Sequence, residues 1–370
     1  MKKIGMVGIG LMGHGIATNL LKHGHELAVL DHPGNQPLEA LRAGGVQVMS
    51  DLVALAARSE VLILVLTGSP AVEAVLTGPG GVLQGLRPGT AVIDCSTALP
   101  ASTQRMAQAL AAAGGRFLDA PMTRTPKEAA EGRLNLLVGG DAALLEQCRP
   151  VLACFAENIT HVGPVSAGHS MKLLHNFVSL GMVTLLAEAA ACAQRSGVAP
   201  EAFVEVLAKG GGGGIALERL KPFLLAQCRP VLACFAENIT HVGPVSAGHS
   251  MKLLHNFVSL GMVTLLAEAA ACAQRSGVAP EAFVEVLAKG GGGGIALERL
   301  KPFLLAQDPS GLRFSIANAQ KDLGYYQTMA HDAGAYDAVA SAVLATLDVG
   351  AARASAGAWV PELARVLSQG

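Results

Sequence analysis

The sequence predicts an N-terminal α/β domain with a largely parallel sheet, followed by an all-helical domain. Between Lys3 and about Gly163, short apolar runs alternate with helical stretches, which is the pattern of βαβ units. After Gly163 the strand pattern stops, and residues 167–195 form one long helical stretch that is apolar nearly all round. We therefore expect one domain over residues 1–163 and a second over residues 164–370, with the long helix buried.

Clusters of Gly and Pro separate the elements, because both residues end regular structure. The expected strands are residues 4–7, 27–30, 61–66, 91–93, 117–119, 134–138 and 159–162. The expected helices of the second domain are residues 167–195, 200–209 and 216–226, with two or three more between 315 and 367.

One segment of the chain occurs twice without a single change. Residues 148–227 (copy 1) recur as residues 228–307 (copy 2). Natural repeat arrays diverge and usually contain three or more units. A single perfect doubling indicates an engineered duplication, a recent tandem event or an error in sequence assembly, and the sequence does not separate these origins.

Composition narrows the class of protein. Hydrophobic residues make up 51% of the chain and charged residues 15%, which is typical of a well-buried globular protein. The net charge of −1 argues against nucleic acid or an anionic membrane surface as a partner. The start of the chain lacks a signal-peptide pattern, and neither the cysteines nor the histidines have metal-ligand spacing. We expect a cytoplasmic protein without a metal site.

A glycine motif follows the first expected strand and opens a helix. Gly8, Gly10 and Gly13 have the GxGxxG spacing of a Rossmann dinucleotide-binding turn, with Leu11 and Met12 between them. Asp31 ends the next strand, where a carboxylate binds the ribose hydroxyls and repels a 2′-phosphate. This favours NAD over NADP, although the neighbouring His32 could weaken the preference. The alternative is that Asp31 only caps a turn.

Polar residues share one face of the long apolar helix. Gly168, Lys172, Asn176 and Ser179 recur at helical spacing. Burial of a lysine lowers its pKa, which suits it to proton exchange near neutral pH. The alternative is a lysine whose stem is buried and whose amine reaches the surface. Periodicity alone leaves both open.

Four motifs together resemble the β-hydroxyacid dehydrogenases, a family that includes 3-hydroxyisobutyrate dehydrogenase, tartronate semialdehyde reductase and sulfolactaldehyde reductase. They are the glycine motif, Asp119-Ala120-Pro121, Gly168-x-x-x-Lys172-x-x-x-Asn176 and Lys321-Asp322-Leu323. The resemblance covers the chain apart from the extra copy. It implies a C-terminal domain like that of 6-phosphogluconate dehydrogenase and NAD-dependent oxidation of a β-hydroxyacid, or reduction of the matching semialdehyde.

The resemblance also implies roles for individual residues. Lys172 would be the general acid/base, Asn176 would orient the substrate, and Lys321 would close over the cofactor with support from Asp322. At the strand ends, the residues expected to line the cofactor cleft are Leu66, Thr67, Ser96 and Thr97. The nearby Cys95 is expected to be structural, because no neighbouring group would activate it.

The substrate would be a small anionic hydroxyacid. After Asp119-Ala120-Pro121 the chain departs from the usual Val-Ser-Gly-Gly and reads Met122-Thr123-Arg124-Thr125, similar to sulfolactaldehyde reductases. Thr123 keeps a hydroxyl, and Arg124 offers a fork suited to a second anionic group. The alternative is that Arg124 is a surface arginine. The other expected substrate contacts are Thr125, His175 and Ser179, although His175 also fits a structural helix histidine.

The duplication repeats the expected catalytic face as Lys252, Asn256 and Ser259. Chain continuity favours copy 1 beside the Rossmann domain, whereas the C-terminal helices should pack on copy 2. Because protomers of this family interlock through their helical domains, we expect copy 2 to occupy a partner's place and to alter the homo-oligomer. The glycine run at 210–214 would approach the nicotinamide or act as a hinge.

Two alternative functions remain open. An imine reductase uses the same scaffold, but those enzymes usually replace the lysine that Lys172 provides. A catalytically impaired cofactor-binding protein would keep the fold and lose turnover.

Overall fold

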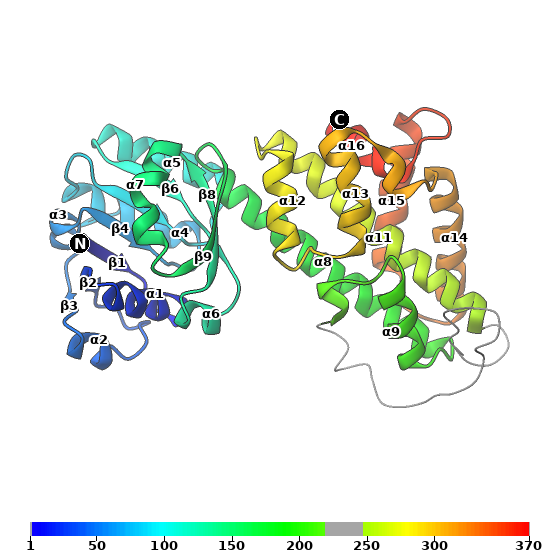
Figure 1. The fold of residues 1–370 in the computed structure, drawn as a ribbon, viewed down its shortest axis with the longest axis horizontal. Helices are drawn as coiled ribbons and strands as arrows, with labels where there is room; N and C mark the ends of the chain where they lie inside the picture. Colours follow the sequence, from blue (N-terminus) through cyan, green and yellow to red (C-terminus); the bar gives the residue numbers. More distant parts are fainter. Residues whose placement is uncertain (1, 219–246, 370) are drawn as a thin grey trace. The chain divides into compact units, whose positions relative to one another are not determined.

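The computed structural model describes residues 2–218 and 247–369 (Figure 1). The chain forms two compact units. The N-terminal unit comprises residues 1–173 and 276–282, and the helical unit comprises residues 174–275 and 283–370. Helix α8 (Ala167–Arg195) begins in the first unit and continues into the second. The first unit extends beyond residue 163 because the first turn of α8 binds Asp119 at the edge of its sheet.

The N-terminal unit contains one sheet of nine strands in the order β3-β2-β1-β4-β5-β6-β8-β7, and β9 also pairs with β8. The strands from β3 to β6 pair in parallel, β8 runs antiparallel to β6 and β7, and β9 is parallel to β8. The order of the first six strands is that of a doubly wound dinucleotide-binding sheet. The strands are β1 (Lys3–Val7), β2 (Glu26–Leu30), β3 (Gln47–Met49), β4 (Val61–Leu64), β5 (Ala91–Asp94), β6 (Arg116–Asp119), β7 (Met122–Thr123), β8 (Leu134–Gly140) and β9 (Ala156–Gly163).

All seven expected strands are present, and two short ones were not expected. β3 and β7 have three and two residues, too few for an alternating pattern to appear in the sequence. The strand expected over 61–66 ends at Leu64, so its predicted end was wrong. The amide of Leu66 instead donates to Ser96 Oγ at 2.9 Å, which turns the chain away from the sheet.

Apolar residues on alternate strand positions fill two cores, one on each face of the sheet. Ile63 and Ile93 belong to one core, and Leu62 and Val92 to the other. Covering both faces explains why these strands are continuous apolar runs. The helices of this unit, apart from the start of α8, are α1 (Leu11–Lys22), α2 (Glu39–Ala43), α3 (Leu52–Arg58), α4 (Ser69–Thr77), α5 (Pro100–Ala112), α6 (Pro126–Ala130) and α7 (Ala142–Leu152).

The helical unit confirms the expected helices over 167–195 and 200–209, and the expected helix over 216–226 extends beyond the described residues. Helices α14, α15 and α16 pack on α11, the copy 2 equivalent of α8. The remaining helices are α9 (Pro200–Lys209), α11 (Ala247–Arg275), α12 (Pro280–Ala288), α13 (Ile295–Ala306), α14 (Ile316–Asp332), α15 (Ala338–Arg353) and α16 (Leu363–Ser368).

The two copies contact each other through the same residues. The amide of Gly211 lies 3.3 Å from His255 Nε2, and the amide of Gly291 lies 3.4 Å from His175 Nε2. A Cβ on Gly210 would lie only 2.0 Å from the ring of His255, so glycine is required there. The glycine run therefore contacts the other copy. The paired contacts relate the two copies by a local two-fold arrangement.

The long helix is not buried all round in both copies. On α8, Phe177 is 42% and Leu180 66% exposed, whereas Phe257 and Leu260 of α11 are 0% and 4% exposed. The expectation of a buried helix is right for α11, on which α14–α16 pack, and wrong for this face of α8.

Helices α8 and α11 are both long and apolar enough to span a membrane by length and composition alone. The most apolar part of α11 is 72% buried within the protein and that of α8 is 44% buried. The core helices of soluble proteins meet the same criterion, so this finding is weak evidence for a membrane span.

Candidate active site

The glycine loop after β1 has the shape that a dinucleotide phosphate requires. Gly8 has φ +95°, and a Cβ on it would lie 2.1 Å from the Val65 carbonyl oxygen. A Cβ on Gly13 would lie 2.0 Å from the Gly8 oxygen, so the loop and α1 pack too closely for a side chain. At Gly10 nothing lies within 4 Å of that position. The first and third glycines make the turn, and the second leaves room for a pyrophosphate.

The start of α1 suits an anion. No side chain caps it at Gly10, and its first turn has no acidic residue. Its first amides therefore lack a side-chain acceptor, and the positive end of the helix dipole is available. Leu11 is exposed and Met12 is half-buried beside this turn. These residues fit the phosphates of NAD or NADP.

Asp31 lies at the carboxyl end of β2, exposed, beside a hollow of about 480 Å³. The residues lining this hollow are Asp31, Arg42, Val46, Val48, Met49 and Ser50. The carboxylate can accept hydrogen bonds from a ribose, as expected. Arg42 was not anticipated, and its guanidinium is a possible partner for a 2′-phosphate. The ring of His32 accepts the Gly34 amide at 3.0 Å within its own loop.

Ser96 holds together the ends of β4 and β5. Its hydroxyl accepts the Leu66 amide, and its own amide donates to Asp94 Oδ1 at 2.9 Å. Ser96 is buried, whereas Thr67 and Thr97 are exposed at the same edge of the sheet. Cys95 is buried, and burial raises the pKa of its thiol well above its ordinary value. This agrees with the expected structural role of Cys95.

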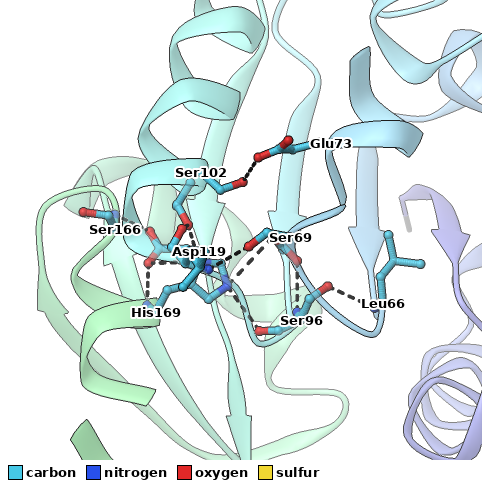
Figure 2. Close-up of polar contacts among 11 residues, drawn as sticks. Leu66, Ser69, Glu73, Ser96, Ser102, Asp119, Ser166 and His169 are labelled. Atoms are coloured by element: carbon cyan, nitrogen blue, oxygen red, sulfur yellow. Dashed lines mark hydrogen bonds and ion pairs between the residues drawn. The ribbon is translucent and has the colours of Figure 1, made fainter. Parts of the chain in front are cut away.

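Asp119, at the end of β6, anchors the first turn of α8 (Figure 2). Its Oδ1 accepts the Ser166 amide and its Oδ2 accepts the His169 amide, both at 2.8 Å. A carboxylate at a helix N-terminus is favoured by the helix dipole. Burial raises the pKa of Asp119, while His169 and the two amides oppose this shift.

His169 completes this anchor and was not assigned a role from the sequence. The ring is fully buried, with Nδ1 2.7 Å from Thr103 Oγ1 and Nε2 3.2 Å from the Ser96 carbonyl oxygen. Figure 2 shows His169 between Asp119 and the loop that carries Ser96. The sequence feature that could have identified His169 is its position as a second polar side chain in the first turn of an apolar helix. Together these bonds hold the first turn of α8 against the carboxyl edge of the parallel strands.

Lys172 lies one turn further along α8, in the N-terminal unit. It is half-buried and forms no ion pair with the described residues. Burial lowers its pKa below the ordinary lysine value. Asn176 follows after another turn, with its Oδ1 3.4 Å from His175 Nδ1. The direction of this pKa shift is the one that brings a lysine closer to proton exchange at neutral pH.

The equivalent residues of copy 2 form a hydrogen-bonded chain within the helical unit. Lys252 Nζ donates to Asn256 Oδ1 at 2.9 Å, and Asn256 Nδ2 donates to Asp322 Oδ2 at 2.6 Å. Lys321 Nζ lies 3.1 Å from Asp322 Oδ1. The structure thus brings Lys321 and Asp322 together with the lysine and asparagine of copy 2.

The three residues of the expected substrate loop, Thr123, Arg124 and Thr125, each make a different local contact. Thr123 Oγ1 is buried and accepts Asn135 Nδ2 at 3.1 Å. Arg124 forms an ion pair with Glu157 and donates to a backbone carbonyl, so its guanidinium is already engaged. Thr125 caps α6 in a capping box with Glu128. The roles of Thr123, Arg124 and Thr125 in substrate binding stay predictions.

The remaining expected residues lie along α8. Ser179 is half-buried, and His175 contacts the glycine run of copy 2. Within residues 2–218 and 247–369, no group of three His, Cys, Asp or Glu side chains could hold a metal ion.

The fold and the site define a nicotinamide-dinucleotide-binding oxidoreductase. Residues 3–163 match the family model for the NAD-binding domain of 6-phosphogluconate dehydrogenase. Residues 166–231 and 246–367 match the NAD-binding model of NADP-dependent 3-hydroxyisobutyrate dehydrogenase. The chain belongs to the β-hydroxyacid dehydrogenase family, and it is an NAD(P)-dependent oxidoreductase that acts on CH–OH groups.

Named relatives support this assignment. The 2-(hydroxymethyl)glutarate dehydrogenase of Eubacterium barkeri is 32% identical over 70% of this chain and 81% of its own length. The NAD-dependent L-serine dehydrogenase of Pseudomonas aeruginosa is 34% identical over 60% of this chain and 74% of its own. An imine reductase structure from Streptomyces aurantiacus, 17% identical, aligns over 98% of both chains with a TM-score of 0.61, which shows a shared fold alone.

Proposed function

We propose that the protein oxidises the primary alcohol of a small β-hydroxyacid with NAD, using Lys172 as the general base. The observation that carries this proposal is the position of Lys172, half-buried on a helix that Asp119 and His169 anchor to the carboxyl edge of the sheet. In doubly wound folds, ligands bind outside that edge.

The substrate class follows from chemistry shared by the relatives. L-Serine, 3-hydroxyisobutyrate and 2-(hydroxymethyl)glutarate all carry a hydroxymethyl group on the carbon next to a carboxylate. They differ only in the third substituent of that carbon. We infer that this chain acts on the same hydroxymethyl carboxylate unit.

Each residue has a distinct task in this proposal. The amides around Gly10 bind the pyrophosphate, and the Asp31 carboxylate binds a ribose hydroxyl. The nicotinamide, when bound, accepts the hydride. Lys172 Nζ takes the proton from the substrate hydroxyl, and it returns that proton in the reverse reaction. Asn176 orients the hydroxyl, and the Thr123 hydroxyl holds the carboxylate.

The preference for NAD is part of the proposal and depends on Asp31. A carboxylate repels the 2′-phosphate of NADP. Arg42 lines the same hollow and works against this preference, so we expect NAD to be favoured without NADP being excluded.

The test is the initial rate of NAD reduction by the full chain with L-serine, 3-hydroxyisobutyrate, 2-(hydroxymethyl)glutarate and a hydroxypropanesulfonate. Turnover of one or more of the carboxylates is expected. A parallel assay follows NADPH oxidation with a cyclic imine. Imine reduction without any hydroxyacid turnover would establish the imine reductase alternative. NADH binding with no turnover in either assay would establish the impaired protein.

A further inference from the structure

Three polar residues form a row across neighbouring strands of the N-terminal unit. Thr123 of β7 lies opposite Asn135 of β8, and Asn135 lies opposite Asn158 of β9. Asn158 Nδ2 donates to Asn135 Oδ1 at 2.9 Å, and Asn135 Nδ2 donates to Thr123 Oγ1 at 3.1 Å. Because opposed side chains of neighbouring strands lie within reach of each other, the row is a continuous hydrogen-bonded chain.

The row lies on the side of β8 that faces the start of α8. Leu134 and Leu136 belong to one core of the sheet, and Asn135 lies between them on the opposite side of the strand. Gly139 shares the side of Asn135, and a Cβ on Gly139 would lie 2.6 Å from the Gly168 amide nitrogen in the first turn of α8. The row therefore lies on the same face of the strand as the helix that carries the proposed general base.

The direction of these hydrogen bonds leaves the Thr123 hydroxyl free to donate. An amide nitrogen only donates and an amide oxygen only accepts, whereas a hydroxyl does both. Because Asn135 Nδ2 fills a lone pair of Thr123 Oγ1, the hydroxyl hydrogen still needs an acceptor. Within residues 2–218 and 247–369, no hydrogen bond donated by this hydroxyl is present. Thr123 is only 5% exposed, so an acceptor from a ligand would stabilise it.

Asn158 sets this direction from the outer end of the row. It presents its amide nitrogen to Asn135, so the Asn135 oxygen turns toward β9 and the nitrogen toward β7. If the outer residue could only accept, the Asn135 amide would turn over, and its oxygen would take the hydrogen of Thr123. An ion pair between Arg124 and Glu157, which adjoin the two ends of the row, joins the outer strands and holds these ends in place.

We propose that Asn135 and Asn158 are positioning residues that orient the Thr123 hydroxyl as a hydrogen-bond donor to the substrate carboxylate. This rests on the proposed function, in which that hydroxyl holds the carboxylate. A carboxylate only accepts hydrogen bonds, so it binds one of the two orientations of the hydroxyl and not the other. The two asparagines act through Thr123 and do not contact the substrate. A hydroxyl that is oriented in advance costs less to order when the substrate binds.

The test reverses the row at its outer end. In Asn158→Asp the new carboxylate only accepts, so the Asn135 amide turns over and the Thr123 hydroxyl donates to it. Calorimetry on the full chain saturated with NADH measures the dissociation constants of 3-hydroxyisobutyrate, L-serine and 2-(hydroxymethyl)glutarate. Those of the carboxylates that bind should rise about tenfold, as expected for loss of a hydrogen bond to a charged group. KM should rise with kcat nearly unchanged, because the carboxylate is held equally before and during the reaction.

A double variant separates the orientation of the hydroxyl from the added charge. Thr123→Val removes the hydroxyl and should raise the same dissociation constants about tenfold, whereas Thr123→Ser keeps it and should bind nearly as the native chain does. When Asn158→Asp is added to Thr123→Val, the further rise should be less than about twofold, because no hydroxyl remains to be turned. An equal rise with and without the hydroxyl would assign the effect to charge and overturn the proposal. Circular dichroism checks that each variant is folded.

The same measurements separate this proposal from the proposed function. Binding that weakens in Thr123→Val and not in Asn158→Asp overturns the proposal and leaves the role of Thr123 standing. Binding that is unchanged in Thr123→Val, or no binding of any of the three carboxylates to the native chain, overturns both. Binding with the expected losses but without turnover supports the positioning role and contradicts the proposed oxidation.

Discussion

His169 and His249 have the same neighbours in sequence and different neighbours in space. His169 is buried between Thr103 and the Ser96 carbonyl, whereas His249 is exposed in the first turn of α11. The difference arises because Asp119 anchors only α8. The sequence showed Lys172, the glycine loop and Asp31, whose chemistry lies in local motifs. It did not show His169, whose partners come from distant strands.

His169→Gln should destabilise the N-terminal unit and lower activity. Loss of a partner in a buried hydrogen-bond network costs about 1–3 kcal/mol. We expect a fall of that size in the free energy of unfolding, measured with denaturant, and a lower kcat. His249→Gln is the matched control and should change neither quantity. Equal effects of the two substitutions would show that the anchor has no special role.

The pH dependence of turnover should follow the protonation state of the Lys172 amine. Oxidation requires the unprotonated amine, so kcat/KM for the alcohol should rise with pH as Lys172 loses its proton. Because burial lowers this pKa, the rise should occur below the ordinary lysine value of about 10.4. Reduction of the aldehyde requires the protonated amine and should fall over the same range. A rise that begins only near the ordinary value would contradict the assignment.

Asp31→Ala should shift cofactor use toward NADP. Removal of the carboxylate removes the repulsion of the 2′-phosphate and the hydrogen bond to the ribose. We expect the ratio of kcat/KM for NADP to that for NAD to rise about tenfold, or about 1.4 kcal/mol. Arg42→Ala, in the same hollow, should shift the ratio in the opposite direction. An unchanged ratio in Asp31→Ala would show that this carboxylate only caps a turn.

At the scale of elements, the sequence predicted the bounds of α8 and α9 closely because each has a clear beginning. Ala167 follows a Gly-Pro turn and Pro200 opens the next helix. Chain continuity predicted that the C-terminal helices pack on copy 2, and their packing on α11 confirms this. The identical sequences of α8 and α11 could not show that Phe177 and Leu180 are exposed while Phe257 and Leu260 are buried. Nor could the sequence predict β7, whose two residues form a strand only because β8 lies beside them.

Glu188 and Glu268 provide a matched pair at this scale. Glu188 is buried and caps the N-terminus of α15, whereas Glu268 is exposed. Glu188→Ala should lower the free energy of unfolding by about 1–2 kcal/mol, as expected for loss of a helix cap. Glu268→Ala should change it by less than about 0.5 kcal/mol. Thermal or denaturant unfolding measures both, and a similar loss in each would mean that the cap contributes little.

At the scale of the whole molecule, the duplication divides the family motifs between two units. The N-terminal unit holds the glycine loop, Asp31 and Lys172, and the helical unit holds Lys252, Asn256 and Lys321. The two copies contact each other reciprocally through their glycine runs and histidines. That copy 2 takes a place that a partner subunit would otherwise fill stays a prediction. The sequence revealed both sets of residues, but their division depends on packing between segments far apart in the chain.

The most direct measurement is the kcat/KM for NAD-dependent oxidation of the best hydroxyacid by Lys172→Ala and Lys252→Ala. If Lys172 is the general base, its loss should lower the rate by about 10²–10⁴-fold, the range for general acid–base catalysis. Lys252→Ala should lower kcat/KM by less than about tenfold, which is the loss expected from disturbing the hydrogen bond between Lys252 and Asn256. The reverse pattern, with activity abolished only by Lys252→Ala, would contradict the assignment of the active site to copy 1.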